Sequence, residues 1–168
     1  MQAIVYTSNT GSTERYAKML AETIHLPVFS MEEAKKKVDA GAEIIYLGWL
    51  MAGAVKGYKE AEKRYNVRAV CAVGMGQTGS QKKEAREKNE IPDKIPLFTL
   101  QGNLDMTKLR GVYKMMINMM IKTVGKSLAD KADRTPEEDD MLEALRGGSD
   151  HVNADNLEEI LEWYGMFE

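Results

Sequence analysis

Short apolar runs alternate with amphipathic or charged segments along the first hundred or so residues. The apolar runs are typical of buried strands, which we predict at residues 3–6, 25–29, 42–50, 67–73 and 95–100. Helical spacing or dense charge between them predicts helices at residues 14–24, 30–40, 58–65 and about 81–88. This alternation predicts an α/β protein with a five-stranded parallel sheet, in the order 2-1-3-4-5, and helices on both of its faces.

The pattern changes after residue 101, where no further strand is predicted. A long helix is expected at 105–128, and a second opens at the capping box Thr135-Pro136-Glu137-Glu138 and stops at Gly147-Gly148. A last helix, capped by Asp155, is expected through residue 164 with apolar positions 157, 160, 161 and 164 on one face. We therefore expect one domain, 1–168, with residues 102–152 as a helical insertion between the last strand and the last helix.

The turn between the first strand and the first helix has an unusual concentration of hydrogen-bonding side chains. Its candidate ligand-binding residues are Ser8, Asn9, Thr10, Gly11, Ser12 and Thr13. The first N–H groups of a helix lack helical partners, and the helix dipole there favours an anion. Because the turn has no Lys or Arg, we predict a phosphate held by neutral donors. The alternative is that Ser and Thr only cap the helix, for which one residue would suffice.

The turns after the third and fourth strands open onto the same edge of the predicted sheet. Gly74 to Gly79 matches the dinucleotide-binding fingerprint in spacing, but it follows the fourth strand and lacks the acidic residue about 20 positions later. Gly125-Lys126-Ser127 resembles the end of a triphosphate-binding loop, but Met120 stands where that loop needs glycine. Neither motif is interpreted as a nucleotide site.

The run from Ile4 to Ala17 resembles the flavodoxin signature, including the aromatic at 6, the hydroxyl at 8, Gly11 and Thr13. The resemblance implies that residues 8–13 hold the phosphate of flavin mononucleotide (FMN). It also implies that the flavin ring lies between loops 50–54 and 75–79, with Trp49 either in the core or turned outward. The ring-binding candidates are Leu50, Met51, Ala52, Gly53, Met75, Gly76, Gln77, Thr78 and Gly79.

The long helix is apolar at nearly every position from Met115 to Ile121, more than one buried face requires. Its flanks are basic, with Lys108, Arg110, Lys114, Lys122 and Lys126. Ordinary core, a homodimer contact, a membrane surface and a hydrophobic substrate remain open for it. This layout is similar to that of quinone-dependent protoporphyrinogen oxidases and their flavodoxin-domain relatives.

Composition limits the function classes. A net charge of −3 gives no reason to expect nucleic-acid binding. The single Cys71 cannot form an internal disulfide, and the opening strand leaves no room for a signal peptide, so we expect a cytoplasmic protein that can lie peripherally at a membrane. His25 and His151 have no partners at metal-ligand spacing, so no metal is expected.

These observations predict an FMN-binding flavoprotein that transfers electrons or performs flavin-dependent redox chemistry. Its partner would be a redox protein or a quinone-like molecule. No residue is a clear acid or base, so the sequence leaves open whether the protein is a carrier or an FMN-dependent oxidoreductase. One alternative is a quinone-linked oxidase of the protoporphyrinogen oxidase type at the membrane surface, and another is a flavin-free interaction module on the same fold.

Overall fold

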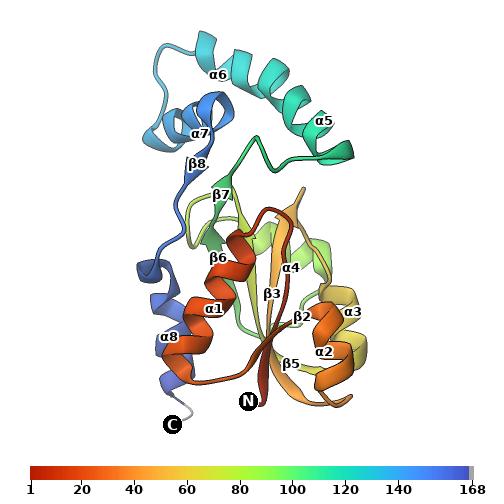
Figure 1. Cartoon of the computed structure of the whole chain (residues 1–168). Helices are drawn as coiled ribbons and strands as arrows, with labels where there is room; N and C mark the ends of the chain where they lie inside the picture. The colour runs from red at the N-terminus through yellow and green to blue at the C-terminus, as the bar shows by residue number, and fades with distance from the viewer. Residues whose placement is uncertain (167–168) are drawn as a thin grey trace. The chain divides into compact units, whose positions relative to one another are not determined.

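A computed structural model describes residues 1–166 and has a parallel sheet at its centre (Figure 1). The strands lie in the order β2-β1-β3-β5-β6, and every pair along this path is parallel. Their bounds are β1 Ala3–Thr7, β2 Val28–Ser30, β3 Glu43–Met51, β5 Asn66–Gly74 and β6 Leu97–Gln101. The predicted α/β class and the 2-1-3-4-5 order are thereby confirmed. The antiparallel strand β4, Ala54–Val55, which pairs with β3, was not predicted.

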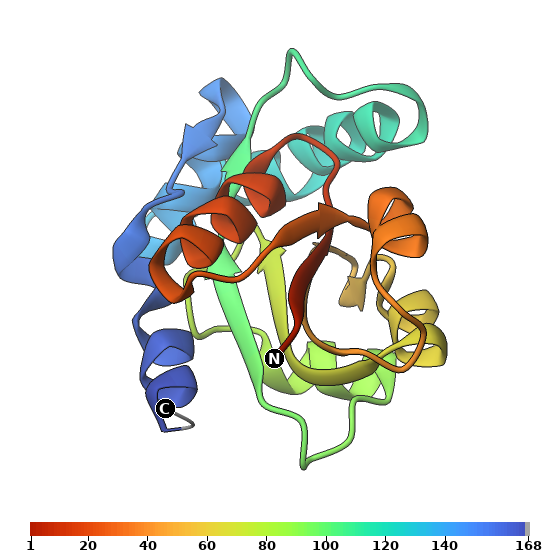
Figure 2. The ribbon, with the colours of Figure 1, turned by 60° about the horizontal axis from the view of Figure 1, so that its bottom comes forward.

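Helices cover both faces of this sheet, which explains why its strands are apolar at successive positions. Ile44 and Tyr46 of β3 belong to one buried cluster, whereas Ile45 and Leu47 belong to the other. In Figure 2, α1 (red) and α8 (dark blue) lie on one side of the strands, and α2 (orange) and α3 (gold) lie on the other. The helices are α1 Ser12–Ile24, α2 Met31–Lys37, α3 Tyr58–Arg64, α4 Lys82–Asn89 and α8 Glu158–Gly165.

Several predicted boundaries were wrong by a few residues. Helix α2 ends at Lys37, not near residue 40, because Val38 is extended and buried, and Gly41 lies in the following turn. His25 is the left-handed cap of α1, so β2 begins later than expected. Asn153 rather than Asp155 caps the last helical segment, which starts as the 3₁₀ turn η2, Ala154–Leu157. The apolar face of that segment is confirmed, since Leu157 and Ile160 are buried against the sheet.

The chain forms two compact units, residues 1–102 with 152–166 and residues 103–151. The second unit occupies the segment expected as a helical insertion. The prediction of a single domain stays a prediction. The elements of the second unit are β7 Asn103–Leu104, α5 Gly111–Met120, the π-helical turn η1 Ile121–Gly125, α6 Lys126–Asp130, α7 Pro136–Gly147 and β8 Ser149–Asp150.

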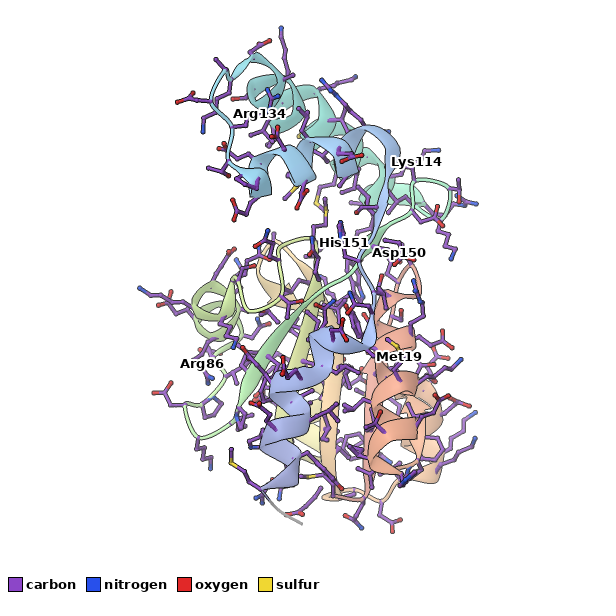
Figure 3. All side chains as sticks on the ribbon, turned by 90° about the vertical axis from the view of Figure 1, so that its left-hand side faces the viewer. Met19, Arg86, Lys114, Arg134, Asp150 and His151 are labelled. Atoms are coloured by element: carbon purple, nitrogen blue, oxygen red, sulfur yellow. The ribbon has the colours of Figure 1, made fainter. Side chains whose placement is uncertain are left out.

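The first helix of this second unit begins at Gly111 rather than at residue 105. The carboxylate of Asp105 accepts the N–H of Thr107 at 2.9 Å, and its carbonyl accepts the N–H of Lys108, so a side-chain turn replaces the first helical turn. Helix α7 has the predicted capping box of Thr135 and Glu138. Arg134, labelled in Figure 3, fixes the turn before α7, since its guanidinium donates to Leu128 O and Lys131 O and pairs with Asp139.

Candidate functional site

The turns after β1, β3 and β5 leave the sheet from one edge. The registers pair Thr7 with Gly48 and Trp49 with Val73, so the three strands end at about the same level. Residues 8–13, 50–53 and 75–79 therefore follow neighbouring strand ends, as Figure 1 shows at the upper end of the sheet. In parallel α/β sheets, ligands bind outside this carboxyl edge near the point where the strand order reverses, here between β1 and β3.

The first turn ends at Gly11, whose φ of +103° favours glycine. Its N–H donates to Ser8 Oγ at 3.2 Å, and its carbonyl accepts the first helical hydrogen bond, from Arg15 N–H at 3.0 Å. Gly11 occupies the N-cap position of α1 and has no side chain, so none of these hydroxyls stands at that position. Ser12 and Thr13 are buried, and Ser8 to Gly11 form the accessible part of the turn.

A buried tyrosine ties the base of this turn to the segment after β3. Tyr46 Oη donates to Lys56 O at 2.6 Å and accepts from the hydroxyl of Thr7 at 2.8 Å, since a carbonyl can only accept. Burial raises the pKa of Tyr46 above its ordinary value, so the ring stays neutral and keeps donating. A Cβ on Gly57 would overlap both hydroxyls. Sequence reasoning missed these residues because the bonds join distant positions.

The predicted loop 50–54 is part of a tight hairpin. Leu50 pairs with Val55 and Met51 with Ala54, and the two residues between, Ala52 and Gly53, have φ of +48° and +76°. These angles define a two-residue turn of type I′. The hairpin holds Leu50 against the core and leaves Met51, like Trp49, half-buried. Lys56 Nζ lies 5.9 Å from the centre of the Trp49 ring.

Helix α4 holds this hairpin through one buried amide. Asn89 Nδ2 donates to Gly53 O at 2.8 Å and to Ala85 O at 2.6 Å, and Asn89 Oδ1 accepts from Val55 N–H at 2.9 Å. A Cβ on Gly53 would lie 2.8 Å from Glu84 Oε1, so the side chain of Glu84 would have to move to admit a larger residue there. The position of Leu50 to Gly53 thus depends on α4.

The turn after β5 is fixed at its far end. Gly79 N–H donates to Thr99 O at 2.9 Å, and the Thr99 hydroxyl donates to Ser80 O. A Cβ on Gly76 would meet the side chains of Ser80 and Gln81. Gly79 is one of the ring-binding candidates, but it uses its N–H to anchor the turn. Met75, Gly76 and Gln77 are the part of the turn that precedes this anchor.

Four hydrogen bonds form a closed ring that joins this turn to α1 and η2. Gln101 N–H donates to Thr78 Oγ1 at 3.0 Å, and the Thr78 hydroxyl donates to Asn156 Oδ1 at 2.8 Å. Asn156 Nδ2 donates to Tyr16 Oη at 2.6 Å, and the Tyr16 hydroxyl donates to Gln101 O at 2.5 Å. Thr78 therefore positions its turn relative to α1. Tyr16 and Asn156 were missed, since no local pattern joins positions 140 residues apart.

The accessible turns contain no titratable side chain. Residues 8–13, 50–54 and 75–79 have no Asp, Glu, His, Cys, Lys or Arg. In residues 1–166, no group of three or more His, Cys, Asp or Glu is placed to hold a metal ion. Nor does any helix in that range have the length and apolar character to cross a membrane. The three turns at this edge offer hydroxyl, amide and backbone groups rather than charged side chains.

The fold and this edge define the class: a flavodoxin-like α/β protein, in which a hydroxyl-rich turn leads into α1 beside an apolar hairpin and a glycine-rich turn. A comparison with known families identifies the same class, because the model of the Flavodoxin domain matches residues 3–130. The chain belongs to this family, which indicates a flavin-linked redox or electron-transfer role in general terms. No curated protein matches the chain.

Proposed function

We propose that the protein binds FMN and transfers electrons through it. The observation that carries this proposal is the start of α1, which follows a neutral, hydroxyl-rich turn and has no side-chain cap. The first N–H groups of a helix and the positive end of its dipole are together suited to a phosphate. In this proposal Ser8, Asn9, Thr10, Gly11, Ser12 and Thr13 hold the phosphate of FMN.

The ring would lie between the β3–β4 hairpin and the turn after β5. Leu50 and Met51 supply apolar surface, Ala52 and Gly53 form the turn of the hairpin, and Met75, Gly76 and Gln77 supply the facing segment. Thr78 and Gly79 act through the bonds that anchor this segment. Bound FMN would supply the chemistry of accepting and releasing electrons, while the chain binds it and limits water around it.

Electron transfer fits these turns better than substrate chemistry. They carry no side chain that could move a proton at neutral pH, which is what an acid–base enzyme needs. The proposed partner is another redox protein or a quinone-like molecule. The quinone-linked oxidase remains a second candidate because large apolar side chains of α5 are exposed. A purified protein that shows no flavin absorbance and does not bind added FMN would favour the flavin-free module instead.

The decisive experiment compares FMN with riboflavin, which has the same ring and no phosphate. Thr10→Asp places a negative charge in the accessible part of the turn, so FMN affinity should fall at least about tenfold by Coulomb repulsion. Riboflavin affinity should stay within about twofold, because its ring does not reach this turn. Thr10→Asn is the matched control of similar size without charge. Flavin fluorescence titration measures all three proteins, and equal FMN affinity in Thr10→Asp would overturn the phosphate site.

A further inference from the structure

Exposed apolar side chains are concentrated on one helical segment. Five large hydrophobic residues in the described part of the chain are exposed, and four belong to residues 111–125. Val112, Met115 and Met119 are 68%, 62% and 61% exposed, and Val124 is 42% exposed. A folded protein normally keeps such side chains apart, so a cluster of them marks a surface that meets something apolar.

Three of these side chains form one stripe along α5. Val112, Met115 and Met119 are spaced i, i+3 and i+7, which places them on the same face of a helix. Ile117 is 6% exposed and is the buried residue of α5, so the other side of the helix serves the core of the second unit. The sequence had left open whether this segment is ordinary core, and the stripe shows that part of it is not.

A row of polar side chains runs beside the methionines. Lys114, Asn118 and Lys122 are spaced i, i+4 and i+8, and with Gly111, Met115 and Met119 they line a shallow open depression. Residues 106–129 contain five Lys or Arg and no Asp or Glu, although the whole chain has a net charge of −3. The face therefore combines apolar side chains with basic ones that lie alongside them.

The positive charge of this face favours an anionic bilayer over a second copy of the chain as its binding partner. A two-fold dimer would place the same patch against itself and bring the two lysines of one copy, Lys114 and Lys122, close to those of the other. An anionic bilayer instead supplies phosphates for the lysines and acyl chains for the methionines at adjacent depths. No helix among the described residues could span the membrane, so the contact would be at its surface.

We propose that the basic-apolar face of α5, formed by Val112, Met115, Met119, Lys114 and Lys122, binds the surface of an anionic lipid bilayer. The helix axis lies parallel to the bilayer, with the Met and Val side chains in the acyl boundary and the lysines at the head groups. This inference concerns residues outside the proposed flavin site and does not depend on flavin binding.

The test is co-sedimentation of the full chain with unilamellar vesicles at low salt. Wild-type protein should bind vesicles of phosphatidylcholine with about 30% phosphatidylglycerol at least tenfold more strongly than vesicles of phosphatidylcholine alone. Lys114→Glu/Lys122→Glu should reduce binding to the anionic vesicles by at least tenfold, since each lysine contributes about fivefold. Met115→Gln/Met119→Gln should also weaken it, without changing the charge.

The matched control is Lys36→Glu/Lys63→Glu, which makes the same change in charge at two exposed lysines of unit 1. Vesicle binding by this control should fall less than about twofold. A fall as large as that of Lys114→Glu/Lys122→Glu would mean that binding depends only on net charge, and it would overturn the proposal. Far-UV circular dichroism of every variant shows whether it folds. The proposal is overturned if the wild-type protein does not bind anionic vesicles. If sedimentation then shows a dimer that Met115→Gln/Met119→Gln dissociates, a second copy of the chain occupies the face instead.

Discussion

At the scale of residues, the ring through Tyr16, Thr78, Asn156 and the backbone of Gln101 has one consistent direction of donation. Each hydroxyl donates once and accepts once, and the amide of Asn156 uses both of its ends. The removal of one member leaves its neighbours with unpaired polar groups in a partly buried region. The members should therefore depend on one another.

A double-mutant cycle tests this dependence. Thr78→Val and Tyr16→Phe should each lower the free energy of unfolding by about 1–2 kcal/mol, because each leaves a donor or acceptor without its partner. The double variant should lose at least about 0.5 kcal/mol less than the sum, since the second change removes a group that the first has already weakened. Urea unfolding measures both. Thr78→Ser keeps the hydroxyl and is the control, and strict additivity would contradict the ring.

Ala52 has a positive φ, which side chains with a Cβ disfavour. Ala52→Gly should therefore raise the free energy of unfolding by about 0.5–1 kcal/mol, because glycine adopts this turn without the steric cost. Ala54→Gly lies in the same hairpin at an ordinary strand position and should lower it instead. Thermal or urea unfolding of the two variants gives opposite signs if the turn is of type I′, and the same sign if it is not.

Two buried tyrosines predict a loss of stability in alkali. Burial raises the pKa of Tyr58 to about 12, and it raises the pKa of Tyr46 as well. The unfolded chain releases these protons from about pH 10 upward, so the stabilisation is complete below that pH and is lost as the pH rises toward the folded values. The free energy of unfolding should fall by up to about 1.4 kcal/mol per pH unit for each tyrosine. In Tyr58→Phe the slope above pH 10 should become shallower, and an unchanged slope would show that Tyr58 does not contribute.

At the scale of elements, the β3–β4 hairpin depends on a helix that is distant in sequence. Asn89 reaches from the end of α4 and satisfies two backbone groups of the hairpin. These hydrogen bonds hold residues 50–53 in place, and in the proposed function these residues face the flavin ring. The hairpin and α4 should therefore act as one unit.

Asn89→Leu keeps the volume of the side chain and removes all three hydrogen bonds. The buried groups at Val55 and Gly53 would lose their partner, so the free energy of unfolding should fall by about 2–3 kcal/mol. FMN affinity should fall too, because the hairpin would no longer be held in one place. Asn66→Ala, at an exposed position of β5, is the control and should change neither value appreciably. A stable Asn89→Leu variant with unchanged FMN affinity would separate α4 from the site.

At the scale of the whole molecule, the second unit leaves and re-enters the first at neighbouring points. Asn103 pairs with Asp150 across the β7–β8 ribbon, so the two connecting strands lie about 5 Å apart. Sheet, flanking helices and all three proposed flavin turns belong to the first unit. The second unit can therefore be considered an addition to a sheet that is complete without it.

Replacement of residues 104–149 by a short Gly-Ser linker should leave a folded protein. The expected FMN affinity is within about threefold of wild type, since a short flexible linker closes this gap at small entropic cost. Circular dichroism and flavin titration check the two expectations. Loss of folding would show that the second unit stabilises the first, and loss of FMN affinity alone would show that it contributes to the site.

Local sequence predicted the parallel strands, the capping box of Thr135 and Glu138, and the hydroxyl-rich turn before α1. Alternation of apolar runs with helical periodicity acts over few residues and indicates a doubly wound fold, whose five-stranded form has the order 2-1-3-4-5. The sequence also predicted that three turns lie at one edge, because the carboxyl ends of parallel strands meet there.

Only the tertiary structure decided which polar groups of those turns are engaged in hydrogen bonds within the protein. The bonds of Gly79, Thr78 and Asn89 join segments up to 78 residues apart, and neither propensity nor spacing contains them. It also decided which side of α5 is exposed, since a segment apolar all round does not specify the face that packs. The sequence by itself thus determined the five parallel strands and the helices between them, because these depend on local periodicity, but not the short strands β4, β7 and β8. The available surface of the site and of α5 depended on long-range packing, which only the folded chain defines.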